Sequence, residues 1–356
     1  MGLSDVWKKE QGNQPDPPPQ GGDKESEQAP LVGTILADRY RIDQVLTYGG
    51  MGVLYLASHL KLHKKFVIKM TLLEKKITAD QQLFQRFRRE AHAMAQIHHP
   101  NVVEIVDYDV MDDRKPYIVM EYVEGENLKQ FMDRHPEGLD PKTFMTFMEQ
   151  ICKGLSAIHE AGIVHRDLKP NNVHVTKKGD QYHLKVLDLG LAYYADAQTQ
   201  TSHQKLTGLN EIVGTPAYMS PEQCKSETVN YLSDVYNLGL LAYELIKGEP
   251  AMQSKTLMDI IDKQISWTPT PIHRTDVSPS IEKAIFKAME KAPENRFQSI
   301  KAFWQALQAA GEPAKTGALP SQEEKTLSIK PPRNQNTILI VMALIILALV
   351  LLLVLR

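Results

Sequence analysis

Two short motifs constrain this chain of 356 residues more than any other feature. The first is HRDLKPNN, residues 165–172, in which Asp167 stands two residues before Lys169 and five residues before Asn172. The second is the tripeptide DLG, which begins at Asp188. Together they supply carboxylates, an ammonium group and an amide, which are groups that hold a divalent cation and steady a phosphoryl group. Because an eight-residue match followed by a second motif is far more specific than a three-residue match, we expect one shared site.

The composition excludes several classes of protein. The 41 basic residues nearly balance the 43 acidic residues, which argues against a nucleic-acid binder driven by bulk charge. The chain has two cysteines and no CxxC pattern, so neither a zinc site nor a disulfide framework is indicated, and a reducing cytosol fits. The first thirty residues lack an apolar core, so no signal peptide is expected.

The character of the sequence changes along the chain. Residues 1–34 are rich in Pro, Gln, Gly and charge, and contain too little apolar surface to offset the entropy of ordering, so they are predicted to be a disordered tail. Residues 35–311 have globular patterning, with strands up to about residue 123 and mostly helices from about residue 124. This division predicts two lobes, 39–123 and 124–311, of an α+β fold. Residues 312–336 are polar again and are predicted to be a linker.

The individual elements follow from periodicity. Strand patterns occur in RYRIDQVL, VLYLAS, KKFVIKM, VVEIVDYDV and PYIVMEYV. Apolar residues at steps of three and four predict a helix over Thr78–Ile97, which Thr78 and Gln81 would open with a capping box. Further helices are predicted over residues 141–161, 229–248, 281–290 and 300–310.

Residues 337–356 end the chain with an apolar segment. Residues 338–355 are apolar without interruption, and a helix of this length spans about 27 Å, close to the thickness of a hydrocarbon core. A buried core helix is the alternative, but the segment is apolar all round and follows a linker. More basic residues precede the segment than follow it, which predicts that residues 1–336 stay in the cytosol. We therefore expect a single-pass transmembrane helix in the cell (plasma) membrane, with the lipid bilayer as a partner.

Two charged residues lie within apolar patterns. Glu90 falls on the apolar stripe of its predicted helix, together with Phe87 and Met94, and Lys69 lies inside the strand pattern FVIKM. A buried charge without a partner costs several kcal/mol, so an ion pair between Lys69 and Glu90 would satisfy both residues. The alternative from local pattern alone is two solvated surface charges.

These motifs resemble those of protein kinases. The segment GTPAYMSPEQ, residues 214–223, is especially similar to that of bacterial Hanks-type (eukaryotic-like) Ser/Thr kinases. The resemblance covers about residues 39–310 and implies a bilobal fold, with a small antiparallel β-sheet lobe that carries one helix and a larger, mostly helical lobe. It implies ATP and Mg²⁺ as cofactors, with Mn²⁺ as a substitute, and proteins with Ser/Thr acceptors as substrates.

The resemblance assigns roles to the motif residues by position. Asp167 would accept the proton of the acceptor hydroxyl, and Lys169 would neutralise charge on the moving phosphoryl group. Asn172 and Asp188 would bind the metal, and Lys69 would hold the nucleotide's α- and β-phosphates. A lysine at the position of Lys169 is typical of Ser/Thr kinases and not of tyrosine kinases.

A glycine-rich stretch, TYGGMG, begins at Thr47 and stands where kinases have G-x-G-x-x-G. Gly49 and Gly52 match the second and third glycines, and Thr47 replaces the first, which we expect to stiffen the loop over the phosphates. Leu54 and Val67 stand where the family usually has the smaller Val and Ala, so a tighter adenine pocket is expected. By itself the stretch fits an ordinary hairpin turn equally well.

The end of the fifth predicted strand resembles the kinase hinge. There the backbones of Glu121 and Val123 would bind adenine, and Met120 would be the gatekeeper, although an ordinary strand end has the same local pattern. The full set of expected ATP-binding residues is Leu46, Thr47, Tyr48, Gly49, Gly50, Met51, Gly52, Val53, Leu54, Val67, Lys69, Glu121 and Val123.

The region that follows the DLG motif suggests regulation and substrate binding. By resemblance Thr215 would approach the catalytic residues, Glu222 would pair with Arg296, and Asp234 would brace the backbone of the catalytic loop. The polar loop before Thr215 contains hydroxyl residues that are candidates for autophosphorylation, Thr207 or a neighbour above all. A phosphate there could pair with Arg166 and order the loop. The candidate hydroxyls are Thr199, Thr201, Ser202, Thr207 and Thr215.

Three functions remain open at this stage. The favoured one is an active, membrane-tethered Ser/Thr protein kinase, for which a second copy of the chain would serve as a partner for autophosphorylation in trans. The second is a catalytically weak or inactive pseudokinase that acts as a membrane-bound scaffold, as the missing first glycine suggests. The third is a small-molecule kinase, against which Lys169 and the GTPAYMSPE segment argue.

Overall fold

The structure is a computed structural model that describes residues 31–49, 52–71, 81–111, 116–188, 216–254 and 256–311. The predictions for Gly50, Met51, the Thr78 cap, Thr207, Thr215, the linker and the apolar segment 337–356 lie outside these residues. Within the described ranges, no helix is both long enough and apolar enough to cross a membrane. Gly33 and Thr34, which the sequence assigns to the tail, already bond to the backbone of Ile42.

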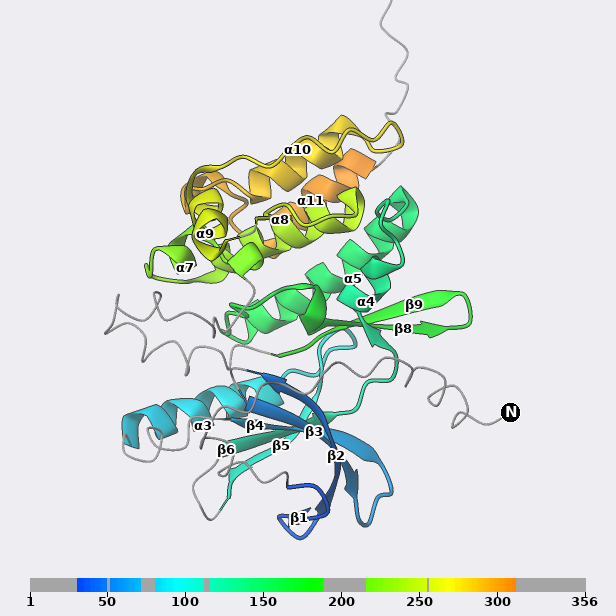
Figure 1. Ribbon diagram of the computed structural model, residues 1–356, viewed down its shortest axis with the longest axis vertical. Helices are drawn as coiled ribbons and strands as arrows, with labels where there is room; N and C mark the ends of the chain where they lie inside the picture. Colours follow the sequence, from blue (N-terminus) through cyan, green and yellow to red (C-terminus); the bar gives the residue numbers. More distant parts are fainter. Residues whose placement is uncertain are drawn as a thin grey trace, which may run out of the picture. The chain divides into compact units, whose positions relative to one another are not determined.

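The first lobe is built on one antiparallel sheet with the strand order β1-β2-β3-β4-β6-β5 (Figure 1). Alternating patterns predict every strand except β1, which is only two residues long. Helix α3, Gln81–Ala95, packs against β5 and buries Phe87, Ala91 and Met94. The strands are β1 Ile35–Leu36, β2 Tyr40–Gly49, β3 Gly52–His59, β4 Lys65–Thr71, β5 Ile105–Val110 and β6 Pro116–Glu121.

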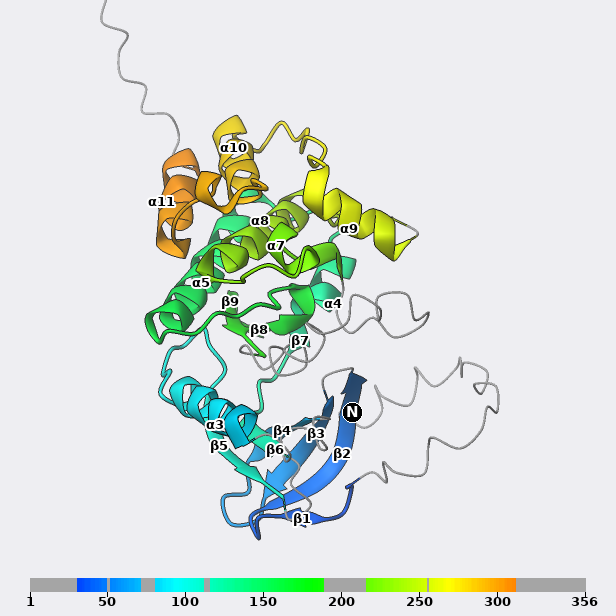
Figure 2. The same cartoon turned by 90° about the vertical axis from the view of Figure 1, so that its left-hand side faces the viewer.

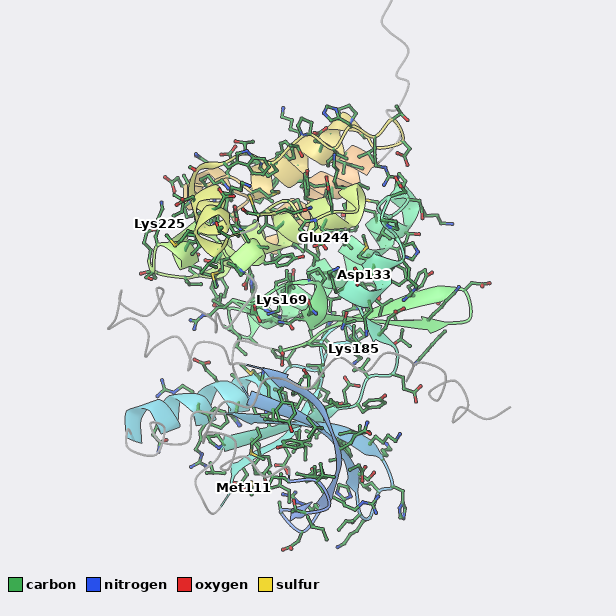
Figure 3. All side chains as sticks on the ribbon, in the orientation of Figure 1. Met111, Asp133, Lys169, Lys185, Lys225 and Glu244 are labelled. Atoms are coloured by element: carbon green, nitrogen blue, oxygen red, sulfur yellow. The ribbon has the colours of Figure 1, made fainter. Side chains whose placement is uncertain are left out.

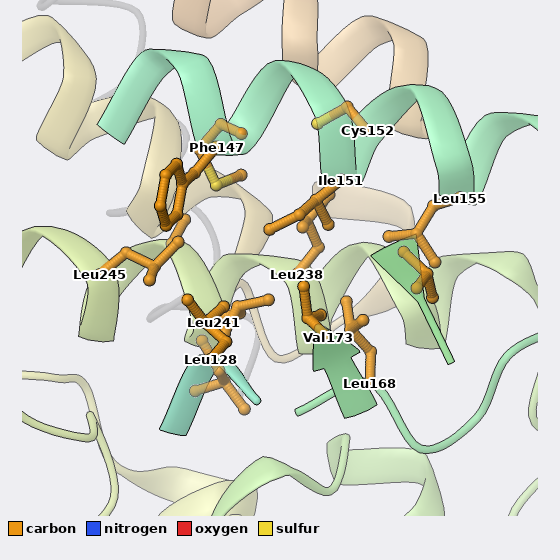
Figure 4. Packing of buried hydrophobic residues seen from close by; sticks show 14 of the residues in the cluster. Leu128, Phe147, Ile151, Cys152, Leu155, Leu168, Val173, Leu238, Leu241 and Leu245 are labelled. Atoms are coloured by element: carbon orange, nitrogen blue, oxygen red, sulfur yellow. The ribbon is translucent and has the colours of Figure 1, made fainter. Parts of the chain in front are cut away.

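The second lobe is mostly helical. Its centre is α8, most of whose side chains are buried, and Figure 4 shows α5 packing on it through Phe147, Ile151 and Leu155. The predicted helices correspond to α5, α8, α10 and α11, whereas the shorter α4, α7 and α9 are not predicted from the sequence. The helices are α4 Leu128–Asp133, α5 Pro141–Glu160, α7 Pro221–Cys224, α8 Tyr231–Lys247, α9 Leu257–Ser266, α10 Pro279–Ala288 and α11 Ile300–Gly311.

The long helices begin and end where local chemistry requires. The Asp140 side chain accepts hydrogen bonds from the backbone N–H groups of Lys142 and Thr143, and Pro141 occupies the first turn of α5. Helix α8 ends at Lys247 and is capped by Gly248, whose φ of 88° lies in the left-handed region. A side chain at Gly248 would also clash with the carbonyl of Pro136, so glycine is required there for two reasons.

A small antiparallel sheet lies in the second lobe beside the connection between the lobes (Figure 1). It consists of β7 Glu126–Asn127, β8 Val173–Lys178 and β9 Gln181–Val186. Val173 and Val175 face the core, as do Leu184 and Val186, so the pattern of a strand is present in both segments. This hairpin is not among the predicted strands, because β8 directly follows the catalytic motif.

Backbone contacts join the two lobes next to this sheet. Val103 N donates to Val186 O at 2.9 Å, and Val186 N donates to Asn101 O at 2.9 Å. The Asn101 side chain also donates to Leu184 O at 2.8 Å. The segment between α3 and β5 is therefore fixed on β9 of the second lobe before the chain returns to the first-lobe sheet.

A buried ion pair joins the start of α7 to the segment between α10 and α11. Arg296 donates to both carboxylate oxygens of Glu222, at 2.8 and 2.9 Å, and Ser233 Oγ donates to Glu222 Oε1 at 2.6 Å. The exposed fractions of the two paired side chains are 0% and 6%. Burial raises the pKa of Glu222, but the hydrogen bonds from Arg296 and Ser233 outweigh it and lower the pKa below its ordinary value.

The first prediction concerns this pair. Glu222→Gln leaves Arg296 as a buried charge without its counter-ion, so we expect the free energy of unfolding to fall by about 3–5 kcal/mol. Glu149→Gln, which breaks the exposed pair with Lys153, should change it by less than about 1 kcal/mol. Urea unfolding of both variants measures the difference, and equal losses would contradict the assignment of a structural pair.

The second prediction is the pH dependence of the same contribution. Because the pKa of Glu222 is lower in the folded state, the stabilisation is fully present above the unfolded pKa of about 4.3 and is lost as pH falls through the folded pKa. The stability difference between the wild type and Glu222→Gln should therefore narrow below about pH 4. Unfolding curves of both proteins measured from neutral to acidic pH provide the check, and a constant difference would be inconsistent with the pair.

Candidate active site

The structure brings the three HRDLKPNN side chains that carry chemistry into one cluster. Lys169 Nζ lies 3.0 and 2.8 Å from the two carboxylate oxygens of Asp167. Asn172 Nδ2 donates to Asp167 Oδ2 at 2.9 Å and to its carbonyl at 2.7 Å. The side chains of Lys169 and Asp167 are 15% and 23% exposed, so both can meet a substrate (Figure 3 labels Lys169).

The side chain of Asp234 of α8 holds the backbone of the HRDLKPNN loop, as the sequence predicts. Asp234 is fully buried, and its two oxygens accept from the backbone N–H groups of His165 and Arg166, each at 2.8 Å. His159 Nε2 lies 2.7 Å from the same carboxylate. Arg166 has a φ of 65°, a strained conformation for a residue with a side chain, which the bonds to Asp234 maintain.

A buried ammonium group reaches this cluster from the other lobe. Lys69 of β4 is only 6% exposed, and its Nζ lies 2.8 Å from Asp188 Oδ1. Burial raises the pKa of Asp188, but the Lys69 ammonium more than compensates and keeps that pKa below its ordinary value. His165 Nε2 lies 2.8 Å from the carbonyl of Leu187, which ties the residue before Asp188 to the catalytic loop. The two motifs therefore meet, as the sequence predicts.

Glu90 lies in the second half of α3 and is partly buried. Lys69 contacts Asp188 in the structure, and the predicted ion pair between Lys69 and Glu90 stays a prediction. The helix does place Glu90 on the side of Phe87 and Met94, both of which are buried in the core.

The strands that carry the expected phosphate loop are β2 and β3. Gly49 pairs with Gly52 across the turn, and Gly52 has a φ of 146°, a conformation that side chains disfavour. Leu46, Thr47 and Tyr48 are exposed, whereas Val53 is buried. Leu54 and Val67 are partly buried and lie opposite Lys69 and Met120, respectively, in the sheet.

The segment after β6 connects the lobes and contains the expected hinge residues. The Glu121 side chain accepts from Glu104 N at 2.9 Å and from Lys185 Nζ at 2.6 Å. Lys185 Nζ also lies 3.3 Å from the carbonyl of Val102 (Figure 3 labels Lys185). The Glu121 carboxylate thus joins the two chain segments that connect the lobes, and it fastens both of them to Lys185 of β9. Val123 is partly buried and packs against the larger hydrophobic core, which contains residues of both lobes.

A family model described as "Protein kinase domain" matches residues 40–308. The chain belongs to the protein kinase family. Curated relatives of this kinase include serine/threonine-protein kinase PknB of Mycolicibacterium smegmatis, 36% identical over 74% of this chain and 41% of that protein. They also include Pkn1 of Myxococcus xanthus, 37% identical over 80% of this chain and 40% of that protein. The enzyme class expected from the sequence, a protein serine/threonine kinase, is thereby confirmed.

Solved structures agree with the fold of the kinase. The PknI kinase domain of Mycobacterium tuberculosis has a TM-score of 0.61 at 24% identity, and the match covers 79% of this chain and 99% of that one. This likeness shows the bilobal kinase fold that the sequence predicts. The chain spans 40% to 54% of the length of three curated relatives, namely PknB of M. smegmatis and the kinases Pkn1 and pkn3 of M. xanthus.

Protein kinases use ATP and a divalent metal, and the donor groups of this kinase fit such a cation. Asn172 uses its amide nitrogen to bond Asp167, which leaves the amide oxygen as the atom for a metal. Lys69 contacts Oδ1 of Asp188, and the second carboxylate oxygen is the atom for the metal. The described residues contain no cluster of three or more His, Cys, Asp or Glu that could hold a metal alone. A carboxylate and an amide that share the ion with phosphates suit Mg²⁺.

Several residues that shape the site are not predicted from the sequence. The ring of His159 bonds Asp234, and the ring of His165, the histidine of the HRD motif, bonds the carbonyl of Leu187. Gln223 Nε2 donates to Arg166 O at 2.7 Å and joins α7 to the catalytic loop. The Lys185–Glu121 contact joins residues distant in sequence, and no local pattern predicts it.

The third prediction tests the role of Asp167. Asp167→Asn keeps the shape of the side chain but removes the proton acceptor, so we expect kcat to fall by roughly 10²–10⁴-fold. Nucleotide affinity should change little, because Lys69 and Asp188 remain. Asp180→Asn, in the exposed turn between β8 and β9, is the matched control and should keep wild-type turnover. Phosphate incorporation and nucleotide binding are the two measurements, and a fully active Asp167→Asn variant would contradict the assignment.

Proposed function

We propose that this protein is a Ser/Thr protein kinase that transfers the terminal phosphoryl group of Mg-ATP to hydroxyl groups of cytosolic proteins and of its own activation loop. The observation that carries the proposal is the contact of Lys69 from one lobe with Asp188 of the other, near the Asp167–Lys169 pair. Lys69 is far from the other three in sequence, and charged groups gathered in this way are typical of a functional site.

The described residues support a proposed role for each part of the reaction. Asp167 is partly exposed and is oriented by Asn172 and Lys169, so it can accept the proton of an approaching hydroxyl group. Lys169 lies beside it and can balance negative charge on the transferred group. Asp188 and Asn172 would hold the metal, which when bound neutralises phosphate charge, and Mn²⁺ is expected to substitute for Mg²⁺. Lys69 and the backbone of Glu121 and Val123 would hold the phosphates and the adenine.

The alternative is a pseudokinase that binds partners without turnover. Thr47 in place of a loop glycine, together with the large side chains of Leu54 and Val67, favours it. The complete set of charged and amide groups at the site favours the active enzyme. Mg-dependent transfer of labelled phosphate to a histone mixture separates the two, with Asp167→Asn as the negative control. An inert wild type that still binds nucleotide would support the pseudokinase.

We also propose autophosphorylation of the activation loop, with a second copy of the chain as the partner. Thr207 or a neighbouring hydroxyl is the expected site, and Arg166, next to the catalytic Asp167, is the expected partner of the phosphate. Mass spectrometry of the protein after incubation with Mg-ATP identifies the acceptor residues. Replacement of Thr199, Thr201, Ser202, Thr207 and Thr215, singly and together, then tests the effect on turnover, and unchanged turnover in every variant would refute this switch.

The fourth prediction concerns the membrane anchor that we propose for residues 337–356. Deleting this segment should release the protein from membranes and leave turnover on peptides near normal, because the kinase fold ends near Gly311. A deletion of the same length within the polar tail, residues 2–21, should leave the membrane association intact. Fractionation followed by washing with high salt is the measurement, and extraction of the wild type by salt alone would rule out the anchor.

A further inference from the structure

The turn Pro216–Tyr218 is held by side chains from two helices. Gln264 of α9 donates from Nε2 to Ala217 O at 2.7 Å and to Pro216 O at 3.2 Å. Asn237 of α8 donates to the next carbonyl, that of Tyr218. Three consecutive carbonyls therefore face inward onto amide groups.

Gln264 is fully buried, and its amide orientation is fixed by what surrounds it. Carbonyl oxygens can only accept, so the nitrogen must face Pro216 and Ala217. On the other side, Gln264 Oε1 accepts from the Tyr236 hydroxyl at 2.7 Å. Lys291 Nζ donates to that same hydroxyl at 2.8 Å, which leaves the hydroxyl proton of Tyr236 directed to Gln264. The amide is thus one link in a chain of hydrogen bonds from α10's end to the turn.

The far end of the same segment is tied to the catalytic loop. We call residues 216–223 the acceptor segment, because it follows Thr215 and leads to α7. Gln223 Nε2 donates to Arg166 O, one residue before Asp167, and Ser220 is buried at the start of α7. The acceptor segment is therefore held at one end by the catalytic loop and at the other by α9, which both views place beside α7 and α8 (Figure 1, Figure 2).

We propose that Gln264 is a positioning residue for the protein substrate. It fixes the position of the acceptor segment relative to the catalytic loop, so that a bound polypeptide presents its hydroxyl group to Asp167. The inference rests on the proposed function and deepens it. Gln264 touches neither the nucleotide-binding strands nor Lys69, so it acts on the acceptor and not on ATP. The acceptor is the polypeptide substrate of the proposed function.

A positioning role and a merely structural role for Gln264 predict different effects on stability and activity. A buried hydrogen bond that only stabilises the fold would affect melting temperature and every activity together. A positioning residue for the acceptor changes transfer to protein while ATP binding and the slow transfer of phosphate to water stay the same. The test therefore measures three quantities on each variant of the full chain: transfer to a histone mixture, ATP hydrolysis without protein acceptor, and nucleotide affinity.

Gln264→Glu is the principal variant. It keeps the acceptor for Tyr236 but replaces the donor with an oxygen that faces the carbonyls of Pro216 and Ala217. We expect kcat/KM for the histone mixture to fall at least about tenfold, with nucleotide affinity and ATP hydrolysis within about twofold of the wild type. Gln253→Glu, an exposed amide that also donates to a backbone carbonyl, is the matched control and should match the wild type in all three.

A second variant keeps the test decisive if Gln264→Glu fails to fold. Gln264→Met removes the donors without adding charge and should lower transfer to protein in the same selective way. Wild-type transfer to protein in both soluble Gln264 variants, or an equal loss of all three quantities in the folded ones, would overturn the inference and leave the proposed function intact. A wild type that neither hydrolyses ATP nor labels protein would instead overturn the proposed function, and this inference with it.

Discussion

The arrangement of the site depends on one buried carboxylate, that of Asp234. A carboxylate with no exposure is costly unless its oxygens are satisfied, and here the donors are the backbone N–H groups of His165 and Arg166 and the ring of His159. The two backbone bonds require the chain to turn sharply at Arg166, which explains its left-handed conformation. That turn directs Asp167 toward Lys169 and Asn172. The catalytic cluster is therefore a consequence of a charge buried in the core helix α8.

Much of this could be predicted from the sequence because the motifs are local. The HRDLKPNN spacing predicts the Asp167–Lys169–Asn172 cluster, and strand and helix periodicity predicts nearly all of the long elements. The Lys185–Glu121 and Gln264–Ala217 contacts could not be predicted, because each joins residues that are far apart in sequence and belong to no motif. The β8–β9 hairpin was predictable in principle: Val173 and Val175 alternate with polar residues, and Gly179 has the positive φ of a tight turn.

The two halves of the site are held by different kinds of interaction. On the nucleotide side, Lys69 and Asp188 form an ion pair between lobes, with Asp188 still a quarter exposed. Glu121 and Lys185 form a second ion pair beside the connection between the lobes. Asp188, Glu121 and Lys185 keep contact with water, which offsets part of what is lost when a contact breaks. Lys69 is buried, so it needs a new anionic partner, such as a phosphate, when it leaves Asp188. Binding of a charged nucleotide and its metal can therefore redistribute these contacts without unfolding the surrounding strands.

The acceptor side has the opposite character. Its carbonyls are bonded to neutral amides of Gln264 and Asn237, both fully or almost fully buried, and breaking such bonds leaves polar groups without partners in the interior. Glu222 and Arg296 add a buried ion pair that has no solvent to replace either partner. Under the proposed function, the acceptor segment is consequently held in place before the substrate arrives. On the nucleotide side, the charges around Lys69 would rearrange when ATP and its metal bind.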